Sequence, residues 1–156
     1  PFVILAILII AITGSGAVTV ILCLSVAYLP YSARVARGAV LSVKEIQYVE
    51  AAKAAGATDL RIILKHILPN IAATLIVMIT MNFAFVLLAE SALQFLGFGV
   101  APPAPSWGLM LKESRRFLEL APWTAIFPGL AIALAVVGFN LMGDGLRDFL
   151  DPKMRD

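Results

Sequence analysis

The sequence predicts an all-α protein, a polytopic bundle of transmembrane helices, and three observations lead to this fold class. Hydrophobic residues make up 61% of the 156 residues and charged residues only 14%, against roughly 45–50% and 25% in soluble domains. The apolar residues gather in runs about as long as the ~20 residues that a helix needs to cross a bilayer. The basic residues are distributed unequally between the loops that separate these runs. A soluble globule of this composition would lack polar surface, so lipid is the expected solvent.

The apolar runs predict one partial span and three full spans. The run at 1–12 is too short to cross a bilayer alone, and it lacks the basic region and cleavage site of a signal peptide. Because the chain starts inside this run, we expect it to be the C-terminal part of a longer polytopic protein. A tight Gly-Ser-Gly turn at 14–16 separates this run from a span at about 17–33. Further helical spans are expected at about 67–89 and 121–142, since a helix satisfies its own backbone hydrogen bonds in lipid.

The basic residues predict the orientation of these spans. Nine lie in the loop after the first full span or in the C-terminal tail, and three lie between 97 and 120. The nine are Arg34, Arg37, Lys44, Lys53, Arg61, Lys65, Arg147, Lys153 and Arg155, and the three are Lys112, Arg115 and Arg116. By the positive-inside rule the loop 34–66 and the tail are cytoplasmic, and the loop 97–120 is external. Topology thus accounts for the basic residues, and with a net charge of only +2 no nucleic-acid partner is expected.

The cytoplasmic loop predicts two short helices joined by a turn. Residues 44–55 are rich in good helix formers. Gly56 suits the left-handed residue that ends such a helix, and Thr58 can cap the next one. In the second helix the helical spacing predicts one apolar face, made of Leu60, Ile63, Leu64 and Ile67. Such an element suits either a solvated connector or docking against a membrane surface or a partner's groove.

The same loop carries a recognisable motif. Residues 50–56 read Glu-Ala-Ala-Lys-Ala-Ala-Gly, and Leu68 and Pro69 follow twelve residues after the glycine. This resembles the EAA loop of ABC-importer permeases, whose pattern is Glu-Ala-Ala, three residues, Gly, nine residues, Ile, one residue, Leu-Pro. Both spacings fit, although His66 stands where the pattern has Ile. The segments 89–99, 102–108 and 139–148, with Asp-Pro at 151–152, are similar to the C-type permeases of dipeptide and oligopeptide importers.

This resemblance implies a fold and a set of partners. The fold is the type I ABC importer permease fold, of which residues 1–156 would form the C-terminal part of one transmembrane domain in the inner membrane of a bacterial or archaeal cell. The implied partners are a second permease subunit, two ATP-binding subunits and an external solute-binding protein, and the implied cargo is a peptide. The same family carrying nickel or another small solute, or a structural membrane subunit without a transport role, stays open as an alternative. The residues implied to couple this chain to the ATP-binding subunits are Glu50, Ala51, Ala52, Gly56, Leu68 and Pro69.

Polar residues in and near the spans are the other candidates for function. Glu90 lies near the outer end of a span, where burying a carboxylate costs several kcal/mol or forces protonation. It could line a transport pathway or pair with another helix, and Asn82 has the same alternatives. In the external loop, Ser106 can cap a short helix that holds Trp107 at headgroup depth. Arg115 and Arg116 then either anchor this loop or contact a binding protein.

An enzyme, a metal site and a cofactor are not expected. The chain lacks the G-x-x-x-x-G-K-[ST] phosphate loop, so it should not itself hydrolyse ATP. Ser15 and His66 would lie on opposite sides of the membrane, about 30 Å apart, which forbids a catalytic pair. Cys23 is alone, which excludes a disulfide framework and predicts a small buried hydrophobe. Helix termination is expected, rather than a calcium loop, at Asp144, Asp148 and Asp151.

Overall fold

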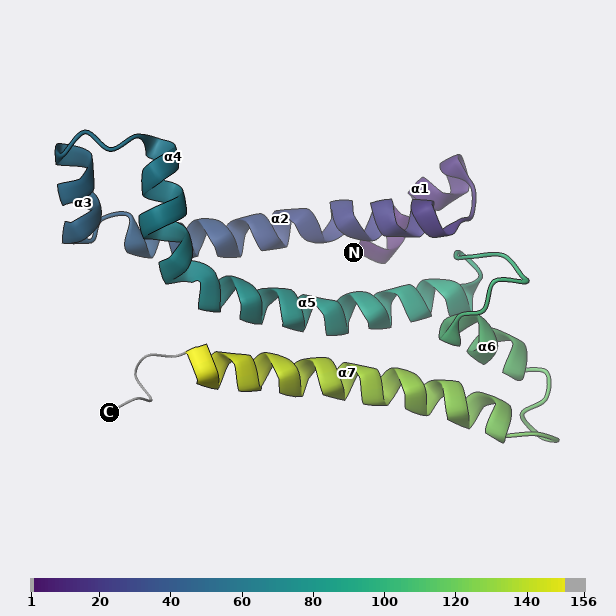
Figure 1. Ribbon diagram of the computed structural model, residues 1–156. Helices are drawn as coiled ribbons and strands as arrows, with labels where there is room; N and C mark the ends of the chain where they lie inside the picture. The colour runs from purple at the N-terminus through teal and green to yellow at the C-terminus, as the bar shows by residue number, and fades with distance from the viewer. Residues whose placement is uncertain (1, 151–156) are drawn as a thin grey trace. The chain divides into compact units, whose positions relative to one another are not determined.

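The computed structural model describes residues 2–150, and every regular element within them is a helix. The all-α fold class is therefore confirmed for this part of the chain. In chain order the helices in Figure 1 are α1 (Phe2–Thr13), α2 (Ala17–Val43), α3 (Gln47–Ala54), α4 (Asp59–Ile62), a π-helix η1 (Ile63–Ile67), α5 (Leu68–Leu96), α6 (Trp107–Ser114) and α7 (Trp123–Leu150).

The three predicted full spans are present as three helical segments long and apolar enough to cross a membrane, at Ala17–Val43, Asp59–Leu96 and Trp123–Phe149. The predicted partial span is the shorter helix α1. Large apolar side chains such as Ile12, Phe127 and Leu134 point outward from these helices. Such faces suit contact with lipid or with other membrane helices.

Two predicted boundaries in this region are wrong. The first full span was expected to end near residue 33, but α2 continues to Val43 with Pro30 inside it. The helix predicted at 44–55 begins only at Gln47, after a turn at 44–46. The reason is that the apolar run ends before the helix does. The alanines and arginines after Pro30 are good helix formers, so the helix continues beyond the apolar segment, and a proline is tolerated within a membrane helix.

The chain divides into two compact units, which we describe separately. The first unit comprises Pro1–Leu29 and Asn82–Asn140, and the second comprises Pro30–Met81 and Leu141–Asp156. The first unit therefore holds α1, α6 and parts of α2, α5 and α7. The second holds the short helices α3 and α4 with the remaining parts of the long helices.

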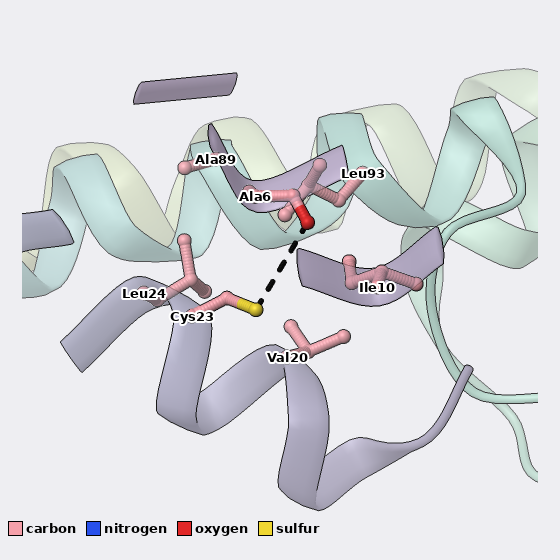
Figure 2. Close-up of a cluster of buried hydrophobic side chains, with 7 residues drawn as sticks. All are labelled: Ala6, Ile10, Val20, Cys23, Leu24, Ala89 and Leu93. Carbon is pink, nitrogen blue, oxygen red and sulfur yellow. Dashed lines mark hydrogen bonds between the residues drawn. The ribbon is translucent and has the colours of Figure 1, made fainter. Parts of the chain in front are cut away.

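The core of the first unit joins α1, α2 and α5 (Figure 2). Its buried residues are Ala6, Ile10, Val20, Cys23, Leu24, Ala89 and Leu93. Cys23 is 1% exposed, and its thiol lies 4.0 Å from the Ala6 carbonyl oxygen, so the predicted buried hydrophobe is confirmed. The predicted turn is confirmed as well: Gly14 has φ +88°, and its N–H donates to the Ile10 carbonyl at 2.8 Å. This is the single-bond left-handed cap that closes a helix, and it lets α1 fold back onto α2.

Candidate docking element and membrane pocket

Helices α3 and α4 form a compact hairpin in the second unit (Figure 1). The turn between them is closed by a Schellman motif, in which the Gly56 N–H donates to the Lys53 carbonyl at 2.9 Å and the Ala57 N–H to the Ala52 carbonyl at 3.1 Å. Gly56 has φ +80°, so the predicted left-handed residue is confirmed. Thr58 occupies the N-cap position of α4, as predicted, but its side chain makes no capping hydrogen bond there.

The hairpin has a small apolar core of its own. Val49 of α3 is fully buried and belongs to a cluster with four other buried residues, Val43, Ile62, Ile67 and Ile71. Five partly buried residues pack against this cluster: Ala39, Val40, Ala52, Ala57 and Leu75. The two short helices are therefore held against the adjoining ends of α2 and α5, within the second unit. The hairpin therefore presents a defined outer surface.

Three of the four residues of the predicted apolar face of the second short helix lie away from the hairpin core. Leu60, Ile63 and Leu64 are 67%, 49% and 55% exposed, whereas Ile67 is buried together with Ile62. The cause is the π-helix η1, whose i to i+5 hydrogen bonds widen the turn and bring residues five apart onto one face. The three exposed side chains form an apolar patch on α4 and η1 that nothing in the described residues covers.

His66 packs in this hairpin. Its ring centroid lies 6.2 Å from that of Tyr48, at an interplanar angle of 41°. The His66 carbonyl accepts a hydrogen bond from the Asn70 side-chain amide at 2.7 Å. The side chain that departs from the Ile of the EAA pattern thus makes a ring contact between η1 and α3.

The predicted coupling residues divide into an exposed set and an inward-facing one. Glu50 and Ala51 are exposed on the side of α3 away from Val49, and Ala54 joins them at helical spacing. Ala52 instead turns inward and packs against the hairpin core. Gly56 is exposed at the turn, while Leu68 and Pro69 are exposed in the first turn of α5, beyond η1. The accessible face therefore consists of an acid and two small side chains.

Glu90 lies in a pocket of the first unit. The pocket has a volume of about 450 Å³ and is lined from α2, α5 and α7 by Val20, Ile21, Leu24, Ser25, Tyr28, Phe83, Val86, Leu87, Glu90 and Phe139. Its walls are apolar except for one carboxylate and two hydroxyl groups. One wall is a stacked aromatic pair, Phe83 and Phe139, with ring centroids 5.5 Å apart and an interplanar angle of 14°. Asn82 is not among the lining residues.

The loop between α5 and α6 brings a second pocket to the same carboxylate. Glu90 also lines a space of about 370 Å³ with Pro105, Ser106, Trp107 and Met110. The Ser106 hydroxyl oxygen accepts a hydrogen bond from the Leu109 N–H at 3.1 Å, so the predicted cap of α6 is confirmed.

Helix α6 is held against α5 by close packing. A Cβ atom added to Gly108 would collide with the Ser91 carbonyl oxygen, so the two backbones lie in direct contact. The Ser91 hydroxyl is buried there without a hydrogen-bond partner among the described residues. Sequence reasoning missed this contact, and the small residues at 91 and 108 were its only local signal.

The basic residues of the loop 97–120, predicted to be external, have different surroundings. The Arg115 guanidinium lies over the Phe95 ring, 5.5 Å from its centroid, which is a cation–π contact between the loop and the end of α5. Arg116 lines a space of about 670 Å³ together with Lys112, Glu113, Arg115 and neighbouring residues. Trp107 is partly exposed. An anchoring contact is thus present for Arg115, and a contact with a binding protein stays a prediction for this loop.

Of the aspartates expected at the helix end, Asp144 lies well inside α7, whereas Asp148 lies in its last turn. Helix α7 runs to Leu150, and Asp151 lies outside the described residues. Gly143, in the same part of α7, is buried, and a Cβ atom added to it would lie 2.7 Å from the Thr80 hydroxyl oxygen. Gly143 therefore allows α7 to approach α5 within the second unit, in the way that small residues do in membrane helix pairs.

Comparison with known proteins adds a family and several relatives. A family model described as the binding-protein-dependent transport system inner membrane component matches residues 1–156. The chain is 46% identical over 155 residues to a dipeptide transport system permease protein of Alkalihalophilus pseudofirmus. It is 44% identical over 155 residues to glutathione transport system permease proteins of Escherichia coli and Shigella flexneri. These alignments cover 99% of this chain and 51% of each relative, so the chain spans about half the length of the curated relatives it matches.

Proposed function

The chain belongs to the family of inner membrane components of binding-protein-dependent transport systems, and we propose that it is a permease subunit of an ATP-driven importer for peptides. Its three spanning helices place it in the membrane as a multi-pass protein. The names of its relatives, for dipeptides and for glutathione, support a peptide cargo. A second permease subunit and an external solute-binding protein are further partners in this proposal, and ATP hydrolysis is left to separate ATP-binding subunits.

The α3–α4 hairpin is the proposed contact with those ATP-binding subunits, and its geometry is the observation that carries the proposal. The hairpin core holds α3 firmly, with Val49 fully buried. The opposite face presents Glu50 with Ala51 and Ala54, and the small size of the two alanines allows a partner surface to approach closely. The exposed apolar patch of α4 and η1, formed by Leu60, Ile63 and Leu64, adds area that a protein partner could bury. A held helix of this kind can pass a partner's movement on to the spans.

Ala51→Leu and, separately, Glu50→Lys are expected to release or uncouple the ATP-binding subunits while this chain still inserts. A tightly docked face does not accept added bulk, because overpacking costs about 1–3 kcal/mol, whereas an exposed solvated face changes stability by less than about 0.5 kcal/mol. The measurement is co-purification of the ATP-binding subunits together with substrate-stimulated ATPase activity. Ala52→Leu is a poorer test, because Ala52 packs inward and the added bulk would strain the hairpin itself.

Two matched controls keep this test specific. Ala51→Ser preserves the small size at the same position. Glu45→Lys repeats the charge reversal at an exposed glutamate in the turn before α3. The Glu45 carboxylate lies 3.4 Å from the Lys44 Nζ. Both controls are expected to retain the subunits. If Ala51→Leu and Glu50→Lys also retain them with wild-type stimulated ATPase activity, α3 is not the coupling helix.

The proposed orientation has its own test. Ala55 and Ala104 are exposed residues in the cytoplasmic and external loops, respectively. In spheroplasts, Ala104→Cys is expected to react with a membrane-impermeant maleimide from outside, and Ala55→Cys only after permeabilisation. The native Cys23 is buried and serves as the unreactive background. Labelling of Ala55→Cys in sealed spheroplasts would show that the orientation is the reverse of the proposed one. The hairpin would then lie outside the cell and could not contact the ATP-binding subunits.

A further inference from the structure

Glu90 is placed where two pockets of the first unit meet. It lines both the space between α2, α5 and α7 and the space beneath the external loop at Pro105, Ser106 and Trp107. No lysine, arginine or histidine is among the residues that line either pocket in the described part of the chain. The basic residues of the external loop lie around a different space. Glu90 is only partly buried, so its carboxylate is accessible to a molecule in either pocket.

The walls around this carboxylate select for one kind of ligand. A carboxylate near the end of a spanning helix is costly unless a positive charge or hydrogen-bond donors compensate it. Leu24, Phe83 and Phe139 offer apolar and aromatic contact, while Ser25 adds a hydroxyl group on the α2 side. A molecule with one ammonium group and an apolar body would satisfy both features. The rings of the pocket would also attract the ammonium group by cation–π contact.

We propose that this pocket binds the terminal ammonium group of a peptide, with Glu90 as its counter-ion. The inference rests on the proposed function as a peptide importer and assigns the ligand group that the pathway recognises. The ammonium group pairs with the Glu90 carboxylate, and the first side chains of the peptide lie against the apolar wall. In this proposal the peptide reaches Glu90 from the external loop through the second pocket, which Glu90 also lines. A lipid acyl chain in the apolar pocket is the competing occupant.

Protection of an introduced thiol tests this proposal directly. The protein is the assembled complex with its partner permease and ATP-binding subunits in lipid nanodiscs, without a binding protein, so that the readout does not depend on delivery of substrate. Ser25→Cys places a thiol in the pocket wall, and Cys23→Ala removes the native one. The rate of modification by N-ethylmaleimide is measured with increasing alanyl-phenylalanine or with its N-acetylated form.

Alanyl-phenylalanine is expected to slow the modification, and the N-acetylated dipeptide is not. Glu90→Gln, which removes the charge but keeps the shape, is expected to raise the concentration needed for protection by about tenfold or more, the range for losing a hydrogen bond to a charged group. Glu90→Asp is expected to keep part of the protection. Glu119→Gln makes the same chemical change at an exposed glutamate that lines neither pocket, and it should leave protection unchanged.

Three outcomes of the measurements with peptide would overturn the proposal, and so would one outcome without peptide. The three are equal protection by the acetylated dipeptide, full protection in Glu90→Gln, and no protection by either peptide in a complex that keeps its ATP-binding subunits. A modification rate that is slow without peptide and rises only in detergent would assign the pocket to a lipid chain, and it too would overturn the proposal. A complex that holds no ATP-binding subunits contradicts the proposed function instead, so the two failures are distinguishable.

Discussion

Gly108→Ala is expected to lower the thermal stability of the protein by displacing α6 from α5. A Cβ atom at this buried position would collide with the Ser91 carbonyl oxygen, and it would lie 2.9 Å from the Ser91 Cα and 2.6 Å from the Gln94 Cβ. Two of these three atoms belong to the backbone of a spanning helix and cannot rotate away. Helix α6 must therefore shift, and overpacking of this kind costs about 1–3 kcal/mol.

The measurement is the midpoint of heat-induced loss of the monodisperse peak, followed by fluorescence-detected size exclusion. Gly138→Ala is the matched control, since Gly138 lies within α7 and an added Cβ would meet nothing within 4 Å. Alanine is the better helix former by about 1 kcal/mol, so the control should be neutral or stabilising. Equal midpoints for the two variants would mean that the close contact of α6 with α5 does not hold in the assembled protein.

Features that depend on local chemistry could be predicted from the sequence. The spans follow from apolar length, and the structure has each of them. The Gly-Ser-Gly sequence predicts a tight turn at Gly14, and the end of a short helix predicts a left-handed residue at Gly56; both glycines have positive φ. Ser106 was expected as a cap because a serine before a short helix can accept a backbone N–H, and it does so. In each case the signal and the structure lie within a few residues of one another.

Features that depend on contacts between distant segments could not be predicted in the same way. The π-helix η1 brings Ile62 and Ile67 together onto the hairpin core, and regular helical spacing alone does not show this pairing. Ala51 and Ala52 are equivalent by composition, and only the position of Val49 in the fold distinguishes the exposed one from the inward one. The span was expected to end at about 142, although Gly143 lies inside α7 and allows its approach to Thr80, 63 residues earlier in the chain. Such contacts leave no periodic signal in a single sequence.

Gly56→Val is expected to abolish most of the uptake while leaving the chain inserted at normal abundance. Gly56 has φ +80°, and an added Cβ would meet nothing within 4 Å. The penalty is therefore one of backbone conformation, about 1–2 kcal/mol for an L-residue and greater for a β-branched one. The Schellman bonds of Gly56 and Ala57 depend on this conformation, so the α3–α4 turn would open and α3 would lose its fixed direction.

A series at this position separates conformation from size. Asparagine tolerates the left-handed region best among the larger residues, so Gly56→Asn is expected to keep more uptake than Gly56→Ala, and Gly56→Ala more than Gly56→Val. If bulk at the docking surface were the cause, Gly56→Asn would instead be worse than Gly56→Ala. Gly38→Ala, at an open glycine inside α2, is the control and should retain full uptake. Wild-type uptake by Gly56→Val would show that transport does not need the left-handed turn, and α3 could then not act as a rigidly held coupling helix.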